Sequence, residues 1–150
     1  MKETKTIAKA ANFTATDFGK LSDIKDYVTV LSPEVKIPGK VFGGHSVDAT
    51  GAEFSFQTFA PGQETGSIHT HKNHEELYFI LGGKGEFQVD GEVFAIGEGS
   101  VVRVAPAGRR SIRNNGSESL VVLCVQYRGA TFTAEDAADG VILGDKVEWK

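Results

Sequence analysis

The chain has 150 residues, a length that suits one domain built around a single hydrophobic core. Apolar residues make up 40% of the sequence and charged residues 24%, which are ordinary values for a globular protein. A formal net charge of −4 argues against a general nucleic-acid-binding or membrane-binding surface.

Residues 1–25 form the expected N-terminal arm. They are mostly polar, rich in Thr, Ala and Lys, and weakly patterned, so we expect order only where the arm docks on another surface. The N-terminus lacks the apolar stretch of a secretion signal, and no run elsewhere approaches the roughly 18 apolar residues of a membrane span. A cytoplasmic location is therefore expected.

Short β-type segments follow one another at intervals of about 8–12 residues, a spacing typical of an all-β sandwich or barrel. The segment AEFSFQTF alternates, with Phe54 and Phe56 on one face and Gln57 on the other. Asp90-Gly91 separates two alternating halves and predicts a tight hairpin. The expected strands lie in DYVTVLSP, AEFSFQTF, LYFIL, EFQVDGEVFAI, VVRVAP and LVVLCVQY, and the basic stretch AGRRSIRNNGSES is expected to be a loop.

The last 20 residues, 131–150, are expected to hold one short helix and a tail. Thr133 followed by AEDAADG has the form of an N-cap, an acidic first turn and a glycine after the helix. The barrel itself is expected over about residues 26–130, within one domain. Cys124 lies in an apolar run, which favours a buried thiol over a reactive one.

The stretch HTHKNHEE places several ionisable side chains within eight positions, 69–76. His69 and His71 are two apart, so on an extended segment both imidazoles point to the same side and can reach one cation. Glu75 has the same parity, whereas His74 and Glu76 have the opposite one. The spacing therefore favours His69, His71 and Glu75 as metal ligands.

The segment PGQETGSIHTHKNHEELYFILGGKGEF resembles the first motif of the cupin superfamily. That motif is a glycine, five residues, HxH, three or four residues, a glutamate, six residues and a glycine. His69, His71 and Glu75 match three of the four metal positions, and Gly82 matches the final glycine. Gly62 lies one residue further upstream than the motif has, which implies an insertion.

A second segment, GSVVRVAPAGRRSIRNN, resembles the second cupin motif: glycine, five residues, PxG, two residues, histidine, three residues, asparagine. Pro106, Gly108 and Asn115 match it, although Gly99 precedes Pro106 by one residue too many. Ser111 stands where the family has its fourth ligand, a histidine. The resemblance covers residues 53–127 and implies a small single-domain cupin: a double-stranded β-helix, or jelly-roll barrel, often dimeric, with its site inside.

The serine at position 111 leaves three alternatives open. His69, His71 and Glu75 alone hold one divalent metal ion (Fe, Zn, Mn or Ni) with open coordination positions. Alternatively, another side chain supplies the fourth ligand, the candidates being His74, His45, Gln57 and Gln126. In the third alternative the metal is lost and the same residues line a pocket, where the Ser111 hydroxyl holds a water.

Three arginines in one loop, Arg109, Arg110 and Arg113, add a candidate anion contact at the mouth of the barrel. Arg113 shares the parity of Ser111 and is expected to point inward.

The sequence thus supports two hypotheses. One is a metal-dependent enzyme, of the dioxygenase or isomerase type, that acts on a small polar or acidic molecule. The other is a non-catalytic module that binds or senses a sugar-like or acidic ligand. The resemblance also implies a homodimer.

Overall fold

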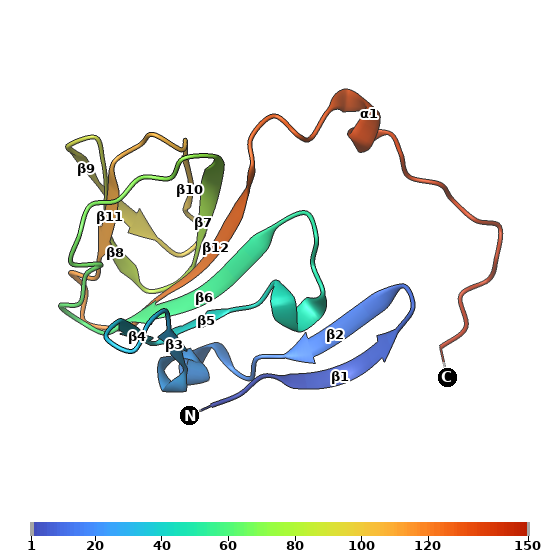
Figure 1. Cartoon of the computed structure of the whole chain (residues 1–150), viewed down its shortest axis with the longest axis horizontal. Coiled ribbons are helices and arrows are strands. Elements are labelled where there is room, and N and C mark those ends of the chain that lie inside the picture. The colour runs from blue at the N-terminus through green and yellow to red at the C-terminus, as the bar shows by residue number, and fades with distance from the viewer. Residues whose placement is uncertain (1, 150) are drawn as a thin grey trace.

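The structure is a computed structural model and describes residues 2–149, whose regular elements are mainly antiparallel strands (Figure 1). The strands are β1 (Lys5–Ala10), β2 (Phe13–Asp17), β3 (Val28–Val30), β4 (Lys36–Pro38), β5 (Lys40–Phe42), β6 (Glu53–Phe59), β7 (His74–Gly82), β8 (Lys84–Val89), β9 (Glu92–Gly97), β10 (Val101–Val104), β11 (Arg110–Arg113) and β12 (Leu120–Arg128). The helical elements are the 3-10 turns η1 (Leu21–Asp26) and η2 (His45–Val47) and the helix α1 (Ala134–Ala137).

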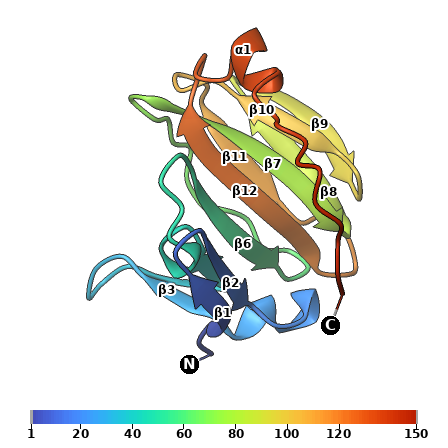
Figure 2. The same cartoon turned by 90° about the vertical axis from the view of Figure 1, so that its right-hand side faces the viewer.

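Two sheets form the barrel. One has five strands in the order β10-β7-β12-β6-β5, and the other has three in the order β11-β8-β9 (Figure 2). β6, β7 and β12 lie side by side although long segments separate them in the sequence, which is the crossing pattern of a jelly roll. This confirms the expected all-β double-stranded β-helix.

The core lies between the two sheets. Buried side chains from the five-stranded sheet meet buried side chains from the three-stranded one, as Phe59, Ile80 and Val122 do with Phe87 and Ile112. Cys124 belongs to the same cluster, so its expected burial is confirmed, and burial raises the pKa of its thiol. Apolar side chains of alternate residues thus form a core between the two sheets, next to the cavity described below.

The N-terminal arm is more regular than its sequence pattern suggests. β1 and β2 pair as an antiparallel hairpin, and Figure 1 shows this hairpin extending away from the barrel. Just after it, the ring of Phe18 packs on the outer face of β6, with its centroid 5.9 Å from that of Phe54 and 5.4 Å from that of Phe56. The arm is therefore anchored through aromatic packing, the docking that the sequence left unspecified.

Turn chemistry follows the sequence closely. Asp90 and Gly91 have φ angles of 51° and 92°, the two positive values that a tight hairpin between β8 and β9 requires. The Thr133 hydroxyl accepts a hydrogen bond from the Asp136 backbone amide at 3.3 Å, and the Asp136 carboxylate accepts one from the Thr133 amide at 2.7 Å. The capped helix was expected; it ends before Gly140 and leads into an exposed tail.

The main departure is β11, which was expected to be part of a loop. It pairs with β8 over four residues, with Ile112 opposite Phe87. β7 also begins at His74, three residues earlier than the apolar run LYFIL. Both differences alter which side chains face the interior.

No helix within residues 2–149 is long and apolar enough to cross a bilayer.

Candidate metal centre

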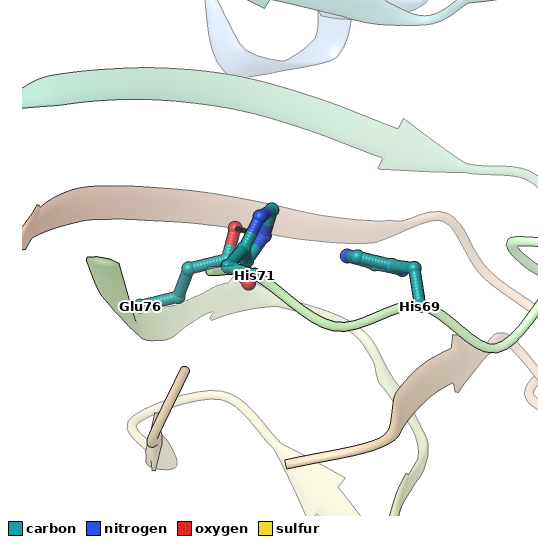
Figure 3. Close-up of side chains that lie close together, drawn as sticks. All are labelled: His69, His71 and Glu76. Carbon is teal, nitrogen blue, oxygen red and sulfur yellow. Dashed lines mark ion pairs between the residues drawn. The ribbon is translucent and has the colours of Figure 1, made fainter. Parts of the chain in front are cut away.

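Three side chains with metal-binding atoms converge inside the barrel. His69, His71 and Glu76 each offer one ligand atom, and these atoms lie within 4.8 Å of one another. Figure 3 shows the imidazole of His69 directed toward His71 and Glu76. The histidines come from the segment before β7, and Glu76 comes from β7 itself. The loop before β7 and the start of β7 therefore form one cluster.

Backbone hydrogen bonds hold the histidine segment against the second motif. The amide of His69 donates to the carbonyl of Arg110 at 3.3 Å, and the amide of Arg110 donates to the carbonyl of His69 at 3.1 Å. The amide of His71 donates to the carbonyl of Pro106 at 2.8 Å. These bonds fix the two imidazoles on the cavity side of the segment, although it is not part of a regular strand.

The structure does not bring Glu75 to the two histidines. Its carboxylate lies on the outer face of β7, where Arg103 Nε on β10 donates to Glu75 Oε2 at 2.8 Å. Arg103 and Tyr127 lower the pKa of Glu75 through these contacts. The inner face of β7 carries Glu76, together with the buried Tyr78. The parity argument therefore placed the two glutamates the wrong way round, because residues 72–73 form a bend and the alternation restarts at His74.

One signal in the sequence does point to Glu76. The cupin motif allows four residues between HxH and the glutamate, and Glu76 is then followed by six residues and Gly83. Gly83 has a φ of +77°, and an added Cβ would lie 2.3 Å from the carbonyl oxygen of Ser119. At Gly82 an added Cβ meets no atom within 4 Å in the described chain. The glycine that the fold requires is thus the one that goes with Glu76.

The two oxygens of Glu76 have different neighbours. Oε1 lies 3.1 Å from His71 Nε2 and 3.6 Å from the sulfur of Cys124. Oε2 accepts a short hydrogen bond from the Tyr78 hydroxyl and lies 3.4 Å from Arg110 Nε. Burial opposes ionisation of this carboxyl, but Tyr78, His71 and Arg110 outweigh it and lower the pKa of Glu76. Glu76 is therefore an anion with Oε1 directed toward the histidines.

The donor set fits a divalent metal. His71 Nε2 is buried and, among residues 2–149, has no hydrogen-bond partner, because its approach to Glu76 is not aligned for one. Burial lowers the pKa of His69, which favours the neutral imidazole with a free lone pair. Two imidazoles and one carboxylate are a common ligand set for Fe²⁺ and Zn²⁺, and an unpaired buried nitrogen is what a missing ligand bond would leave behind.

Arg110, rather than Ser111, projects toward this cluster. The Arg110 side chain is 1% exposed, and its Nη2 donates to the carbonyl of Ala105 at 3.0 Å. Ser111 lies opposite Gln88 in the β8–β11 pairing, and its hydroxyl is 2.7 Å from that of Thr65. The position expected for a fourth ligand thus shifts by one residue.

The asparagine of the second motif shifts in the same way. Asn114 is buried, and its amide donates to the carbonyls of Phe59 at 2.8 Å and Glu118 at 2.7 Å, whereas Asn115 is exposed. Arg110 precedes Asn114 by the same interval at which the family's histidine precedes its asparagine. An arginine therefore takes the place of the fourth histidine.

The other candidates lie in different places. Gln57, Gln126 and Ser111 are among the residues that line the cavity beside the cluster. His74 stacks on His71, with ring centroids 3.8 Å apart, so it supports that imidazole from the side. His45 lies exposed in η2, outside the cavity lining.

Arg113 was expected to point inward, and the structure corrects this. It pairs with Glu86 on the other face of β11, because Arg110 and Ile112 are the residues of that strand that face inward.

The cavity has a volume of about 190 Å³ and is lined by residues of both sheets and of the segment before β7. This is below the roughly 300–1,000 Å³ of typical small-molecule sites, so it suits a small ligand. Its walls combine the histidine–glutamate cluster with apolar side chains such as Phe59, Phe87 and Val122. The cluster is thus open to a space that a small molecule can occupy.

Comparison with known proteins agrees with the fold and with the two motifs. Residues 55–126 match the family model described as a cupin domain. A cupin protein from Bacteroides fragilis is 30% identical, with a TM-score of 0.66 over 77% of this chain and 94% of that one. A proposed sugar phosphate isomerase from Acidithiobacillus ferrooxidans is 28% identical, with a TM-score of 0.57 over 67% of this chain and 66% of that one.

A curated relative, an uncharacterized protein of Methanocaldococcus jannaschii, is 35% identical over 60 residues, which are 40% of this chain and 48% of the relative. The chain therefore spans about half the length of that relative. The family match covers the segment that holds both motifs, and the Bacteroides fragilis structure is matched over nearly its full length. The chain belongs to the cupin family.

Proposed function

We propose that the protein is a metal-binding cupin in which His69, His71 and Glu76 hold one divalent metal ion next to a small ligand. The observation that carries this proposal is the convergence of the three donors within 4.8 Å at the wall of a cavity. A bound metal of this kind supplies Lewis acidity or an O₂-binding position. Fe, Zn, Mn and Ni are all compatible with the donor set.

The neighbours of the cluster prepare it for this role. Tyr78 and Arg110 both contact Oε2 of Glu76, so the carboxylate is held in one orientation and Oε1 faces the histidines. Partners that orient a ligand in this way commonly change metal affinity by about 10–100-fold. The stacked ring of His74 restricts His71 similarly. The fold thus holds the ligand atoms in position before a metal ion binds.

The proposed activity is that of a metal-dependent enzyme of the oxygenase or isomerase type on a small polar or acidic molecule. The likeness to a proposed sugar phosphate isomerase supports the isomerase alternative by analogy. A second candidate, a metal-free ligand-binding module, is favoured by one observation: a buried arginine stands where the family has its fourth ligand. Metal content separates the two candidates.

We also propose that the protein forms a homodimer through the outer face of the five-stranded sheet. Leu77, Phe79, Leu123 and Val125 share this face and are only partly buried, and Val101 beside them is 54% exposed. Contiguous apolar surface of this kind marks an interaction site in soluble proteins. Light scattering of the purified protein tests this, and a monomer at all concentrations contradicts it.

The expected cytoplasmic location stays a prediction.

The metal proposal is tested by elemental analysis of the purified protein and of matched variants. We expect about one divalent ion per chain in the wild type, and a loss of that ion in Glu76→Gln. Glu75→Gln is the control, because its carboxylate faces Arg103 on the outside. His69→Gln is a second variant, since His69 is partly exposed and its substitution is tolerated more readily. Metal that persists in both Glu76→Gln and His69→Gln contradicts the proposal.

A further inference from the structure

A lysine that the two motifs do not include lies in the wall of the cavity. Lys40 on β5 lines the 190 Å³ cavity together with His69 and Glu76. Within residues 2–149 its ammonium makes no hydrogen bond or ion pair with another side chain, and its nearest recorded partner is the ring of Phe42, whose centroid is 5.0 Å away. An ammonium group inside a barrel normally has an anionic partner.

Burial lowers the pKa of Lys40, with weaker opposing effects from Cys124 and Glu76. The charge of this lysine is thus costly without an anionic partner. A side chain that is held in such a place without a partner is poised to gain one from a ligand, since an anion there offsets the cost of desolvation.

The other charges in the cavity do not satisfy Lys40. Glu76 is the carboxylate in the lining, and its oxygens already face His71, Tyr78 and Arg110. Arg110 is itself matched by Glu76 and by the carbonyl of Ala105. The cavity therefore has two fixed cations for one fixed anion, and a divalent metal increases this excess of positive charge. With or without metal, the space favours an anionic ligand.

The position of Lys40 indicates where the anionic group binds. Lys40 pairs in register with Gln57 on β6, so the ammonium and an amide lie side by side on neighbouring strands. Both residues also line a second cavity of about 380 Å³, and so does His69. Because these residues are common to both spaces, they flank the connection between the inner cavity and the adjoining one. A ligand that reaches the inner cavity from this side passes the ammonium group.

Apolar side chains make up a large part of the inner lining, among them Ile37, Phe42, Phe59, Phe87, Ile112 and Val122. One ammonium with one or two amides suits the single negative charge of a carboxylate. A phosphate dianion carries more charge and more acceptor oxygens than these donors match. The small volume adds a limit on the size of the ligand.

From these observations we infer that Lys40, with Gln57 beside it, binds the carboxylate of a small organic acid whose apolar body lies among the aromatic and aliphatic side chains of the cavity. This inference rests on the proposed function in one respect, namely that the cavity beside His69, His71 and Glu76 is the ligand site. It does not require the metal, because Lys40 supplies its own charge.

The test compares butanoate with its neutral analogue butanamide, using ligand-observed NMR titration of chelator-treated, metal-free protein. We expect butanoate to bind at least about tenfold more tightly than butanamide, the effect of one charge-assisted hydrogen bond. Inorganic phosphate is expected to compete poorly. Lys40→Met, which keeps the length of the side chain, is expected to abolish the preference for butanoate, and Lys40→Arg is expected to retain it.

Lys36→Met is the matched control, because it removes the same charge from an exposed residue of β4 outside both cavities. A preference that Lys40→Met leaves unchanged overturns the inference, and so does an equal loss in Lys36→Met. Phosphate that binds more tightly than butanoate overturns the assignment to a carboxylate. If butanoate binds only to metal-loaded protein and without regard to Lys40, the metal proposal stands and this inference fails. If butanoate binding depends on Lys40 in a protein that takes up no metal, this inference stands and the metal proposal fails.

Discussion

Arg110 Nε lies 3.4 Å from Glu76 Oε2, and both side chains are almost completely buried inside the barrel. The pair joins β11 to β7 across the interior, at the place where the family has its fourth metal ligand. The arginine, together with Tyr78 and His71, lowers the pKa of Glu76, and it also adds a positive charge close to the proposed cation. Both effects can be measured separately.

The first prediction concerns metal affinity. Arg110→His is expected to bind a divalent metal more tightly than the wild type by about tenfold or more, the scale on which changes next to metal ligands act. The substitution removes a charge that repels the cation and places an imidazole beside Glu76. Competition against a chromogenic chelator measures the affinity.

Ser111→His is the matched control for this prediction. The hydroxyl of Ser111 contacts that of Thr65, so a histidine at this position is not directed at the cluster. We therefore expect little change in metal affinity. A Ser111→His variant that binds metal more tightly than Arg110→His would show that position 111 faces the cluster after all.

The second prediction concerns stability. Arg110→Met is expected to lower the free energy of unfolding by about 3–5 kcal/mol, because it leaves the Glu76 carboxylate buried without its cation. Urea denaturation of the metal-free protein measures this. The double variant Arg110→Met/Glu76→Gln is expected to recover most of the loss, since neither charge then remains buried.

Arg109→Met serves as the control, because Arg109 is exposed and adjacent in sequence. The prediction fails if Arg110→Met is no less stable than Arg109→Met. It also fails if the double variant is less stable than the wild type by the sum of the losses in Arg110→Met and Glu76→Gln.

Much of the fold was predictable because local patterns and barrel geometry agree. The alternation in β6, the Asp90-Gly91 turn and the Thr133 cap are each set by neighbouring residues. The choice between Glu75 and Glu76 was not, since it depends on how many residues the bend before β7 consumes. The bend is held by a backbone bond from His71 to Pro106, a contact between distant segments that periodicity does not contain.

β11 and Lys40 show a second limit. The inward face of β11 begins with Arg110, so a charged residue occupies a position that a hydrophobic pattern assigns to solvent. Lys40 likewise points into the cavity from a strand of only three residues. Charges that face a site break the rule by which strands are recognised. For that reason the sequence indicated Arg110 only as a contact at the mouth of the barrel, and it did not indicate Lys40.

The third prediction uses two glycines with positive φ. Gly83 has a φ of +77°, and an added Cβ would lie 2.3 Å from the carbonyl oxygen of Ser119. Gly99 has a φ of +85°, and an added Cβ there meets no atom within 4 Å in the described chain. Gly99→Ala is expected to cost about 1–2 kcal/mol of stability, the price of the left-handed backbone alone.

Gly83→Ala is expected to cost about 1–3 kcal/mol more than Gly99→Ala, because the backbone next to β12 must also shift. Thermal and urea denaturation of the two variants give the comparison. Equal losses would mean that the β7–β8 connection yields without strain, and that the spacing from Glu76 to Gly83 is not a structural requirement.

The fourth prediction concerns pH. The hydrogen bonds from Arg103 and Tyr127 lower the pKa of Glu75 in the folded protein below its ordinary value of about 4.3. The unfolded chain therefore binds the proton more readily than the folded one. The stabilising contribution of this pair is fully present above the unfolded pKa, and it is lost as the pH falls through the lower, folded pKa.

Glu75→Gln removes this contribution, so the variant is expected to be less stable than the wild type at pH 7, with a difference that shrinks toward pH 3. Because Arg103 is 59% exposed, added salt is expected to reduce the difference at pH 7 as well. Urea midpoints across the pH range test this, with Glu98→Gln on an exposed turn as control. A Glu75→Gln deficit that is constant with pH and salt would mean that Glu75 acts through packing rather than charge.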